Sequence, residues 1–234
     1  MMSDTPDGLD ALQECLGYRF NNPALLVRAL THPSYLQQCP DADGHNQRLE
    51  FLGDAVLGLV LAEHLWETFP QEREGTLTRH RAALARGDRL AEVARSLGLP
   101  DHLRLSDAEA ANNGRGRQSI LEDALEAVIG AIYLDGGHTA ARVCVPLWYG
   151  DIERHLSEVA EEHNPKGRLQ ERLQPALGND AIHYEVTEES GPDHRKAFTV
   201  CVRVNGEVCG TGRGASKKEA EEAAARAALE QMDG

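Results

Sequence analysis

The feature that most constrains this 234-residue chain is a long apolar segment that carries two acidic residues. From His45 to Leu65 the sequence HNQRLEFLGDAVLGLVLAEHL is apolar almost all round a helix, which predicts that the helix is buried. Glu50 and Asp54 are four residues apart, so they lie on one face of that helix. Buried carboxylates are costly unless something compensates their charge, and this pair therefore needs an explanation.

A second segment, SILEDALEAVIGAIYL from Ser119 to Leu134, repeats the pattern with Asp123 and Glu126 three residues apart. For one such pair, a helix cap, an ion pair or exposure at a helix start would be sufficient explanations. Two pairs in two nearly apolar helices instead favour four oxygen ligands that meet at one place. Mg²⁺ and Mn²⁺ prefer such ligands, and the usual work of such a cluster is phosphoryl chemistry.

The chain divides into two parts of different character. Residues 1–157 contain long helical patterns and no convincing alternating strand, which predicts an all-α domain. The charged stretch 158–163, just before Asn164-Pro165, is predicted to be a linker or a helix start. Residues 164–234 predict a small α/β domain with the order α-β-β-β-α.

The second part has clear local signals. Residues 183–187 and 198–204 alternate between apolar and polar side chains, which is typical of strands. Asn205-Gly206 is a strong hairpin signal. The final helix is predicted to begin at SKKE, residues 216–219, because its Ser and Glu have the spacing of a capping box.

The five cysteines show no framework spacing, which favours reduced thiols and a cytoplasmic protein. Pairing of Val204 with Glu207 in the hairpin would place Cys201 opposite Gly210 and Cys209 on the other face of the sheet. The two thiols are therefore not expected to form a disulfide. The acidic N-terminus resembles no signal peptide, and no stretch approaches a membrane span, so no membrane association is expected.

The formal net charge of −14 argues against a nucleic-acid partner, because phosphate binding favours a basic surface. Residues 1–163 hold 14 basic and 26 acidic residues, whereas residues 164–234 hold 10 basic and 12 acidic ones. Most of the negative charge therefore belongs to the first part. A local basic patch in the second part stays compatible with these numbers.

The run NQRLEFLGDAVL, residues 46–57, resembles the signature of the ribonuclease III family. LGYRF and LLVRALTHPSY before it, with EGTLTRHRAALARGDRLA and LEDALEAVIGAIYLDGG after it, are similar to that family in order and spacing. The resemblance implies that Glu50, Asp123 and Glu126 ligate a metal and that Asp54 and Glu126 are the catalytic residues. Mg²⁺ would be the metal, with Mn²⁺ as a substitute, and no small-molecule cofactor is expected.

Two further acidic positions of the family bear on the site. Glu74 matches an accessory acidic position. Gln47 stands where the family often has Glu, and an amide cannot supply the negative charge that such a position would give. A fully acidic second set of ligands is therefore not expected.

The resemblance also implies a homodimer and cleavage of double-stranded RNA to 5′-phosphate and 3′-hydroxyl ends with short 3′ overhangs. Processing of ribosomal RNA precursors and other structured transcripts would be the corresponding role. Phe51 matches a dimer-interface aromatic residue, with ordinary core packing as the alternative.

Residues 164–234 resemble a double-stranded-RNA-binding domain, which recognises A-form shape through 2′-hydroxyl and phosphate contacts. The resemblance implies that Gln170 and Glu171 face a minor groove and that His194 reaches the next one. Lys217 and Lys218 open the last helix, where free N–H groups favour a phosphate. The alternative for these lysines is a solvated helix start.

Two rival functions remain at this point. A catalytically inactive double-stranded-RNA-binding protein on the same fold would be expected to lack one or more of the four carboxylates, and all four are present. A metal-dependent phosphohydrolase acting on small nucleotides would explain the carboxylates. It would leave the second domain without a role.

Overall fold

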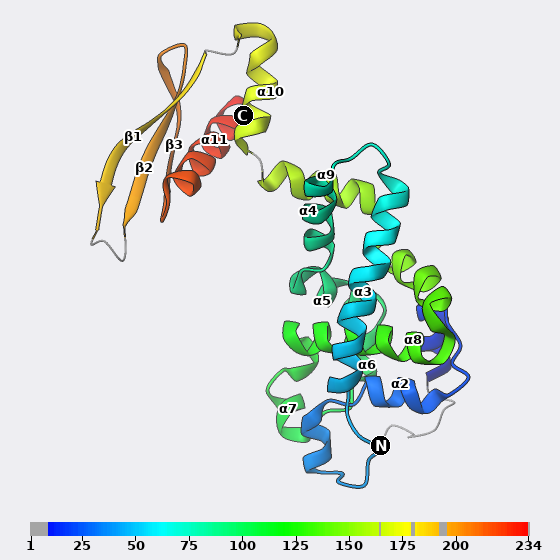
Figure 1. Cartoon of the computed structure of the whole chain (residues 1–234). Coiled ribbons are helices and arrows are strands. Elements are labelled where there is room, and N and C mark those ends of the chain that lie inside the picture. The colour runs from blue at the N-terminus through cyan, green and yellow to red at the C-terminus, as the bar shows by residue number, and fades with distance from the viewer. Residues whose placement is uncertain (1–8, 164, 179–180, 192–195, 234) are drawn as a thin grey trace. The chain divides into compact units, whose positions relative to one another are not determined.

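A computed structural model describes residues 9–163, 165–178, 181–191 and 196–233 (Figure 1). The chain forms two compact units, Met1–Ile152 and Glu153–Gly234. Within the described residues the first unit contains helices alone, and the second contains helices and one sheet. This agrees with the expected all-α domain followed by a small α/β domain.

The helical unit is built from short helices around two long ones. The long helices are α3 (Gln47–Thr68) and α8 (Gln118–Trp148). The shorter elements are α1 (Asp10–Leu16), α2 (Pro23–Ala29), η2 (Pro33–Gln37), α4 (Glu74–Leu84), α5 (Gly87–Ser96), α6 (Leu99–His102), α7 (Asp107–Ala111) and η3 (Gly114–Gly116).

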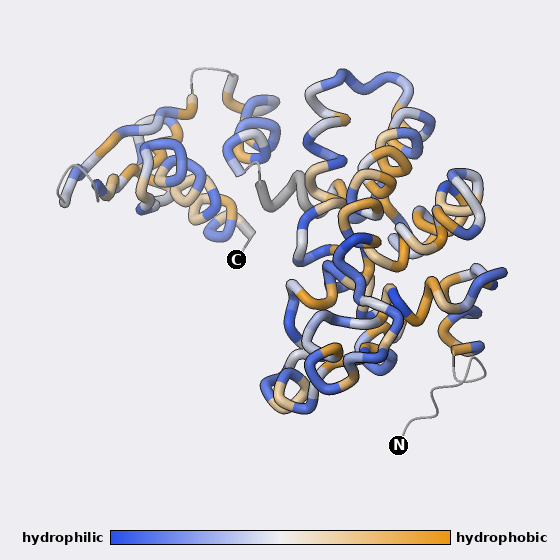
Figure 2. Tube along the Cα trace, turned by 60° about the horizontal axis from the view of Figure 1, so that its bottom comes forward, coloured by the Kyte–Doolittle hydropathy of each residue, from blue (hydrophilic) through white to orange (hydrophobic). Residues whose placement is uncertain are grey.

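The core of this unit lies between α3 and α8, and Figure 2 shows hydrophobic positions gathered at its centre. The apolar side chains that these two helices bury almost completely include Val56, Leu57, Val60, Leu61, Leu65, Leu121, Leu125, Val128, Ile129 and Ile132. The predicted burial of α3 on all sides is wrong for a single chain. Phe51 is 82% exposed and Trp66 is 72% exposed, because no other described element of the helical unit covers that face.

Helix α8 is interrupted at Gly137, and Asp135 just before this break binds the N-terminal segment. Gly137 has φ 74° and ψ −176°, a conformation that a residue with a side chain would rarely adopt. Just before the break, Asp135 accepts hydrogen bonds from the Tyr18 hydroxyl at 2.8 Å and from the backbone N–H groups of Asn21 and Asn22 at 2.7 and 2.9 Å. These bonds hold the start of α2 against α8.

The second unit has the expected order α-β-β-β-α, preceded by one additional helix, α9. Its helices and strands are α9 (Ile152–His163), α10 (Pro165–Leu177), β1 (Ile182–Ser190), β2 (Ala197–Val204), β3 (Glu207–Gly214) and α11 (Lys217–Asp233). The sheet is antiparallel with the order β1-β2-β3. The stretch 158–163 is the C-terminal half of α9, which begins six residues earlier.

The β2–β3 hairpin differs from its expected register by one residue. Val204 pairs with Glu207 as expected, but Cys201 pairs with Thr211 instead of Gly210. An irregularity after Val202 inserts one residue into β3, and such a bulge shifts all pairs beyond it. Both cysteines of the hairpin are free thiols.

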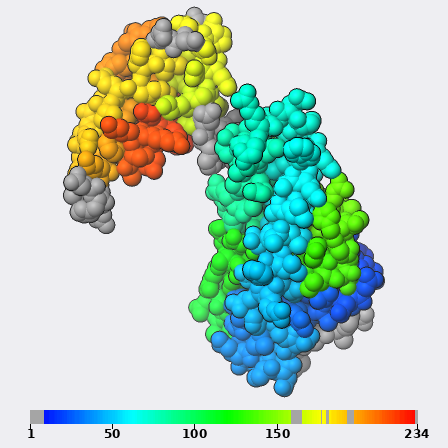
Figure 3. All heavy atoms as spheres, viewed as in Figure 1, coloured from blue at the N-terminus to red at the C-terminus, as the bar shows by residue number. Residues whose placement is uncertain are grey.

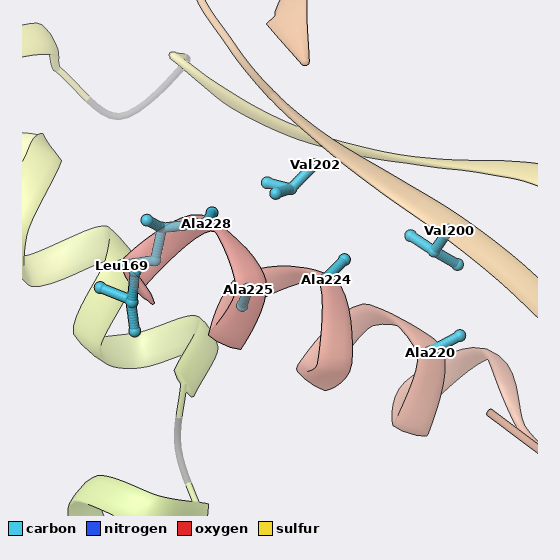
Figure 4. Packing of buried hydrophobic residues seen from close by; sticks show 8 residues of the cluster. Leu169, Val200, Val202, Ala220, Ala224, Ala225 and Ala228 are labelled. Carbon is cyan, nitrogen blue, oxygen red and sulfur yellow. The ribbon is translucent and has the colours of Figure 1, made fainter. Parts of the chain in front are cut away.

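Small residues let α11 lie close to the sheet. Figure 4 shows Val200 and Val202 of β2 directed toward the alanines of α11. A Cβ on Gly212 of β3 would lie 2.1 Å from the backbone nitrogen of Ala224. Gly210 and Gly214 meet α11 in the same way. The alternating glycines of β3 therefore allow the helix backbone to touch the strand.

Candidate carboxylate and RNA-binding sites

Two glycines bring the backbones of α3 and α8 into direct contact. A Cβ on Gly53 would lie 1.7 Å from the carbonyl oxygen of Glu126, which no real structure tolerates. A Cβ on Gly130 would lie 2.3 Å from the carbonyl oxygen of Leu49. The absence of a side chain at each glycine thus leaves room for the backbone of the other helix. This reciprocal contact places the acidic turn of α3 against the acidic turn of α8.

The four acidic residues singled out in the sequence lie on these two turns. Glu50 and Asp54 belong to α3, and Asp123 and Glu126 belong to α8. Glu50, Asp123 and Glu126 are partly buried, whereas Asp54 is exposed. The full burial inferred from the apolar sequence is therefore not observed, and the cluster opens to solvent on one side.

The pKa of Glu126 shows that these charges act on one another. Burial is the largest of the effects that together raise the pKa of Glu126 to about 8, and the negative charges of Asp54, Glu122, Glu50 and Asp123 contribute the rest, in that order. The carboxylate is therefore largely protonated at neutral pH in the metal-free chain. Excess negative charge of this kind is typical of a site that holds a cation.

Burial also raises the pKa values of Glu50 and Asp123. For Glu50, the charges of Asp123 and Glu122 add to the effect of burial. For Asp123, the ring of His32 acts in the opposite direction. Negative charge on α3 and α8 is thus coupled across the helix contact.

Glu122 is a member of this cluster that the sequence analysis missed. Burial raises its pKa most, and the negative charges of Asp123 and Asp88 add to this effect. It lies one helical turn before Glu126 in α8, so the same spacing rule that selected the other acids also applies to it. We refer to Glu50, Asp54, Glu122, Asp123 and Glu126 as the carboxylate cluster.

The donor chemistry of the cluster fits a divalent cation. Carboxylate oxygens are the ligands that Mg²⁺ and Mn²⁺ prefer, and the mutual repulsion in the cluster would be relieved by positive charge. No three His, Cys, Asp or Glu side chains form a ready-made metal-binding group in the part of the chain that the structure describes. Binding would therefore require the flexible carboxylate arms to converge further.

Glu74 and Gln47 are not among the five residues of the carboxylate cluster. Glu74 is the first residue of α4 and accepts a hydrogen bond from the Thr78 hydroxyl at 3.0 Å. It comes after the C-terminal end of α3, and that end of the helix is roughly 20 Å along the axis from Asp54. Gln47, the first residue of α3, is exposed. Within one chain the structure does not bring Glu74 to the carboxylate cluster.

The residues expected to contact RNA lie on two helices of the second unit. Gln170 and Glu171 are exposed on α10, and Lys217 and Lys218 are exposed at the start of α11. His194 lies outside the described residues. The four described side chains are thus accessible to a ligand.

The start of α11 is formed as the capping-box spacing predicts. The Glu219 N–H donates to the Ser216 hydroxyl at 3.2 Å, and the Glu219 carboxylate accepts from the Ala215 N–H at 2.9 Å. The ammonium of Lys217 lies 5.8 Å from the centre of the Phe198 ring. Lys218 is 3.9 Å from Glu222, a long and exposed ion pair that contributes little.

Phe51 lies on the exposed side of α3, so it does not pack in the core of its own chain. Figure 3 shows α3 at the surface of the helical unit. Leu59 is 50% exposed, and Phe51 and Trp66 are more exposed still. These residues recur along one stripe of α3, so the helix presents an apolar face that is exposed among the described residues of its unit.

Comparison with known proteins finds a counterpart for each of the two units. The family model described as ribonuclease-III-like matches residues 22–149, and the double-stranded RNA binding motif matches residues 165–232. A protein named ribonuclease 3 from Carboxydothermus hydrogenoformans is 44% identical over 96% of this chain and 95% of its own length. Another of that name, from Symbiobacterium thermophilum, is 47% identical over 92% of this chain and 91% of its own length.

A solved structure supports the same conclusion for the first unit. The nuclease domain of ribonuclease III from Campylobacter jejuni has a TM-score of 0.56 and 42% identity, covering 60% of this chain and 95% of that one. The fold and its sites define a helical nuclease domain joined to a double-stranded-RNA-binding domain. The chain belongs to the ribonuclease III family.

Proposed function

We propose that the chain is an endoribonuclease that hydrolyses phosphodiester bonds of double-stranded RNA, with Asp54 and Glu126 as its catalytic residues. The observation that carries this proposal is the carboxylate cluster, formed where Gly53 and Gly130 let α3 and α8 touch. The relatives named ribonuclease 3 support the same activity. Retention of all four expected carboxylates favours an active enzyme over an inactive double-stranded-RNA-binding protein.

We further propose that Glu50, Asp123 and Glu126 hold a divalent metal ion, Mg²⁺ with Mn²⁺ as a substitute. When bound, such an ion supplies an activated water and stabilises charge on the leaving oxygen. The chain's own contribution is to fix the ligands on two helices whose backbones are in contact, which limits their movement. Asp54 is exposed and can therefore contact water or RNA directly.

The second unit would supply most of the affinity for RNA. Gln170 and Glu171 on α10 offer polar groups for the 2′-hydroxyls of a minor groove. Lys217 and Lys218 combine their charges with the free N–H groups of a helix start, which suits a backbone phosphate. Such contacts recognise duplex shape and leave the base sequence unread. The products would carry 5′-phosphates, 3′-hydroxyls and short 3′ overhangs.

We also propose that the enzyme is a homodimer and that Phe51 lies in its interface. The apolar stripe of Phe51, Leu59 and Trp66 is exposed in one chain, and a second copy would remove it from water. The Campylobacter jejuni structure is described as having a region of its nuclease domain involved in dimer formation. We also propose a cytoplasmic location, because the five cysteines lack the spacing of a disulfide framework. Separately, none of the described helices combines the length and apolar composition that crossing a bilayer requires.

One experiment tests the activity. The full chain is incubated with a long RNA duplex, a single-stranded RNA, a DNA duplex and a nucleoside triphosphate, with and without Mg²⁺. Cleavage of the RNA duplex alone, and only with Mg²⁺, is the expected result. Duplex binding without cleavage would identify an inactive binding protein. Hydrolysis of the nucleotide with an intact duplex would identify a small-nucleotide phosphohydrolase.

A further inference from the structure

The turn between α4 and α5 lies directly against the carboxylate cluster. A Cβ on Gly87, the first residue of α5, would lie 2.2 Å from Oε2 of Glu122 and 2.9 Å from its Oε1. The carboxylate of Glu122 thus occupies the space that a side chain at Gly87 would fill. The backbone of Arg86, the residue before Gly87, is therefore located next to a member of the cluster.

Hydrogen bonds and buried side chains hold this turn in place. The Tyr149 hydroxyl donates to the carbonyl of Leu84, the last residue of α4, at 3.2 Å. Nη2 of Arg89 donates to the carbonyl of Tyr149 at 2.9 Å. Leu84 and Leu90, on either side of the turn, are completely buried. The backbone that carries Arg86 is therefore fixed from both sides.

Asp88 orients the guanidinium of Arg86 and leaves one end of it open. Nε of Arg86 donates to Oδ1 of Asp88 at 3.2 Å, and Nη2 donates to Oδ2 at 2.5 Å. Both bonds use the Nε–Nη2 edge of the planar group, so Nη1 with its two N–H donors faces away from Asp88. Both side chains are half-exposed, and an exposed pair of this kind contributes little to stability.

A cation at this place answers a requirement of the substrate. RNA is a polyanion, so a cluster of carboxylates repels its phosphates unless positive charge lies nearby. Arginine suits a phosphate because its planar fork can donate two parallel N–H bonds. A guanidinium whose backbone and direction are already fixed also loses little freedom when it binds.

We propose that Arg86 binds a backbone phosphate of the RNA through the end of its guanidinium that Asp88 leaves open. Because the turn touches the cluster at Glu122, which is not an expected metal ligand, we place this phosphate next to the one that is cut. The inference rests on the proposed nuclease activity and adds a substrate contact to it. This contact belongs to the first unit, whereas Lys217 and Lys218 belong to the second.

Opposite changes of charge at one ion pair test the contact. Arg86→Ala removes the proposed phosphate-binding cation, and Asp88→Asn removes the acid that competes for it. Arg19→Ala and Asp10→Asn are the controls, because they make the same changes at an exposed pair 3.2 Å apart elsewhere in this unit. Affinity for an RNA duplex is measured without metal at several salt concentrations, kcat/KM is measured with Mg²⁺, and Tm reports folding.

We expect Arg86→Ala to lower duplex affinity and kcat/KM by about tenfold, with little change in Tm. The slope of log affinity against log salt should flatten by about one unit. Asp88→Asn should bind the duplex at least as tightly as the parent, and both control variants should stay within about twofold of it. Equal losses in Arg86→Ala and Asp88→Asn would overturn the proposal, because the ion pair itself would then be the operative feature. A parent-like slope in a folded Arg86→Ala protein would overturn it too.

Modified substrates locate the phosphate. Cleavage at one mapped bond is measured on duplexes in which a neutral methylphosphonate replaces each neighbouring phosphate in turn. One replacement should slow the parent and cost Arg86→Ala nothing further, whereas additive losses at every position would contradict the contact. Arg86→Gln, which is also neutral, takes the place of Arg86→Ala if that variant does not fold. A parent that binds the duplex but does not cut it would refute the proposed activity, while the affinities and the salt slopes would still judge Arg86.

Discussion

Gly53 of α3 touches the backbone of Glu126 of α8: a Cβ at Gly53 would stand 1.7 Å from the Glu126 carbonyl oxygen. The contact lies within one turn of three members of the carboxylate cluster, Glu50, Asp54 and Asp123. The distance between the two helices therefore sets the distance between their acidic side chains. A glycine at this position links the packing of the core to the geometry of the site.

Gly53→Ala should separate the two helices and disturb the site. Because the added methyl group meets backbone, which cannot rotate away, we expect a loss of roughly 1–3 kcal/mol in the free energy of unfolding. Duplex cleavage should fall as well. Thermal unfolding and a cleavage assay check this. Gly75→Ala in α4, where the nearest atom to a Cβ is the Arg79 side chain at 3.9 Å, is the control and should change Tm little.

Glu126→Gln should remove cleavage while it preserves binding. The substitution keeps size and helix propensity but removes the negative charge of a proposed metal ligand, so duplex cleavage should fall by orders of magnitude. Affinity for the duplex, measured without metal, should stay close to that of the parent. Gln47→Glu should leave cleavage within about an order of magnitude. Full activity of Glu126→Gln under saturating Mg²⁺ would refute the catalytic assignment.

The raised pKa of Glu126 predicts a pH-dependent stability in the metal-free chain. The folded chain holds this proton up to about pH 8, whereas an unfolded Glu releases it near its ordinary value of 4.5. The stabilising contribution is thus complete below about pH 4.5 and is lost as the pH rises through 8. The amide of Glu126→Gln does not titrate, so this loss is absent in the variant.

With a chelator present, the Tm of Glu126→Gln should therefore rise relative to that of the parent between pH 5 and pH 8.5. We expect a gain of roughly 2–4 °C at the upper end, about 1 kcal/mol for a chain of this size after allowance for solvent screening. Scanning calorimetry across this range measures it. A difference in Tm that does not vary with pH would contradict the assignment.

The double variant Lys217→Ala, Lys218→Ala should weaken binding to all RNA duplexes alike. Each lost phosphate contact should also flatten the dependence of log affinity on log salt by about one unit. Affinity measured at several salt concentrations checks both effects. Arg203→Ala is the control, because Arg203 is occupied by Glu185 at 3.0 Å and by the carbonyl of Gly206. An unchanged slope in the double variant would show that the lysines are only solvated.

Phe51→Glu should produce a folded monomer. Phe51 is 82% exposed, so a charge there costs the single chain little, whereas it would be buried in the proposed dimer interface. Light scattering gives the mass, and circular dichroism confirms the helices. Val208→Glu, at a half-exposed position of β3 in the other unit, should leave the mass unchanged. A dimer of Phe51→Glu at micromolar concentration would place the interface elsewhere.

The helical positions of the acids could be predicted because the period of a helix fixes which residues share a face. Glu50 with Asp54, and Asp123 with Glu126, needed only their spacing. Glu122 had the same signal, one turn before Glu126, and was missed because only one pair was sought in that segment. The hairpin turn was predicted from Asn205-Gly206, but the bulge beyond it was not.

The sequence by itself therefore determined the type and order of the elements, because local periodicity and turn chemistry are properties of consecutive residues. It also determined which acids face the same side of each helix. Only the tertiary structure decided that Glu126 has a pKa of about 8, because its burial and the nearby charges of Asp54 and Glu50 come from the packing of α3 on α8. The exposure of Phe51 was decided in the same way, since an apolar residue on a helix becomes core or surface according to what covers it.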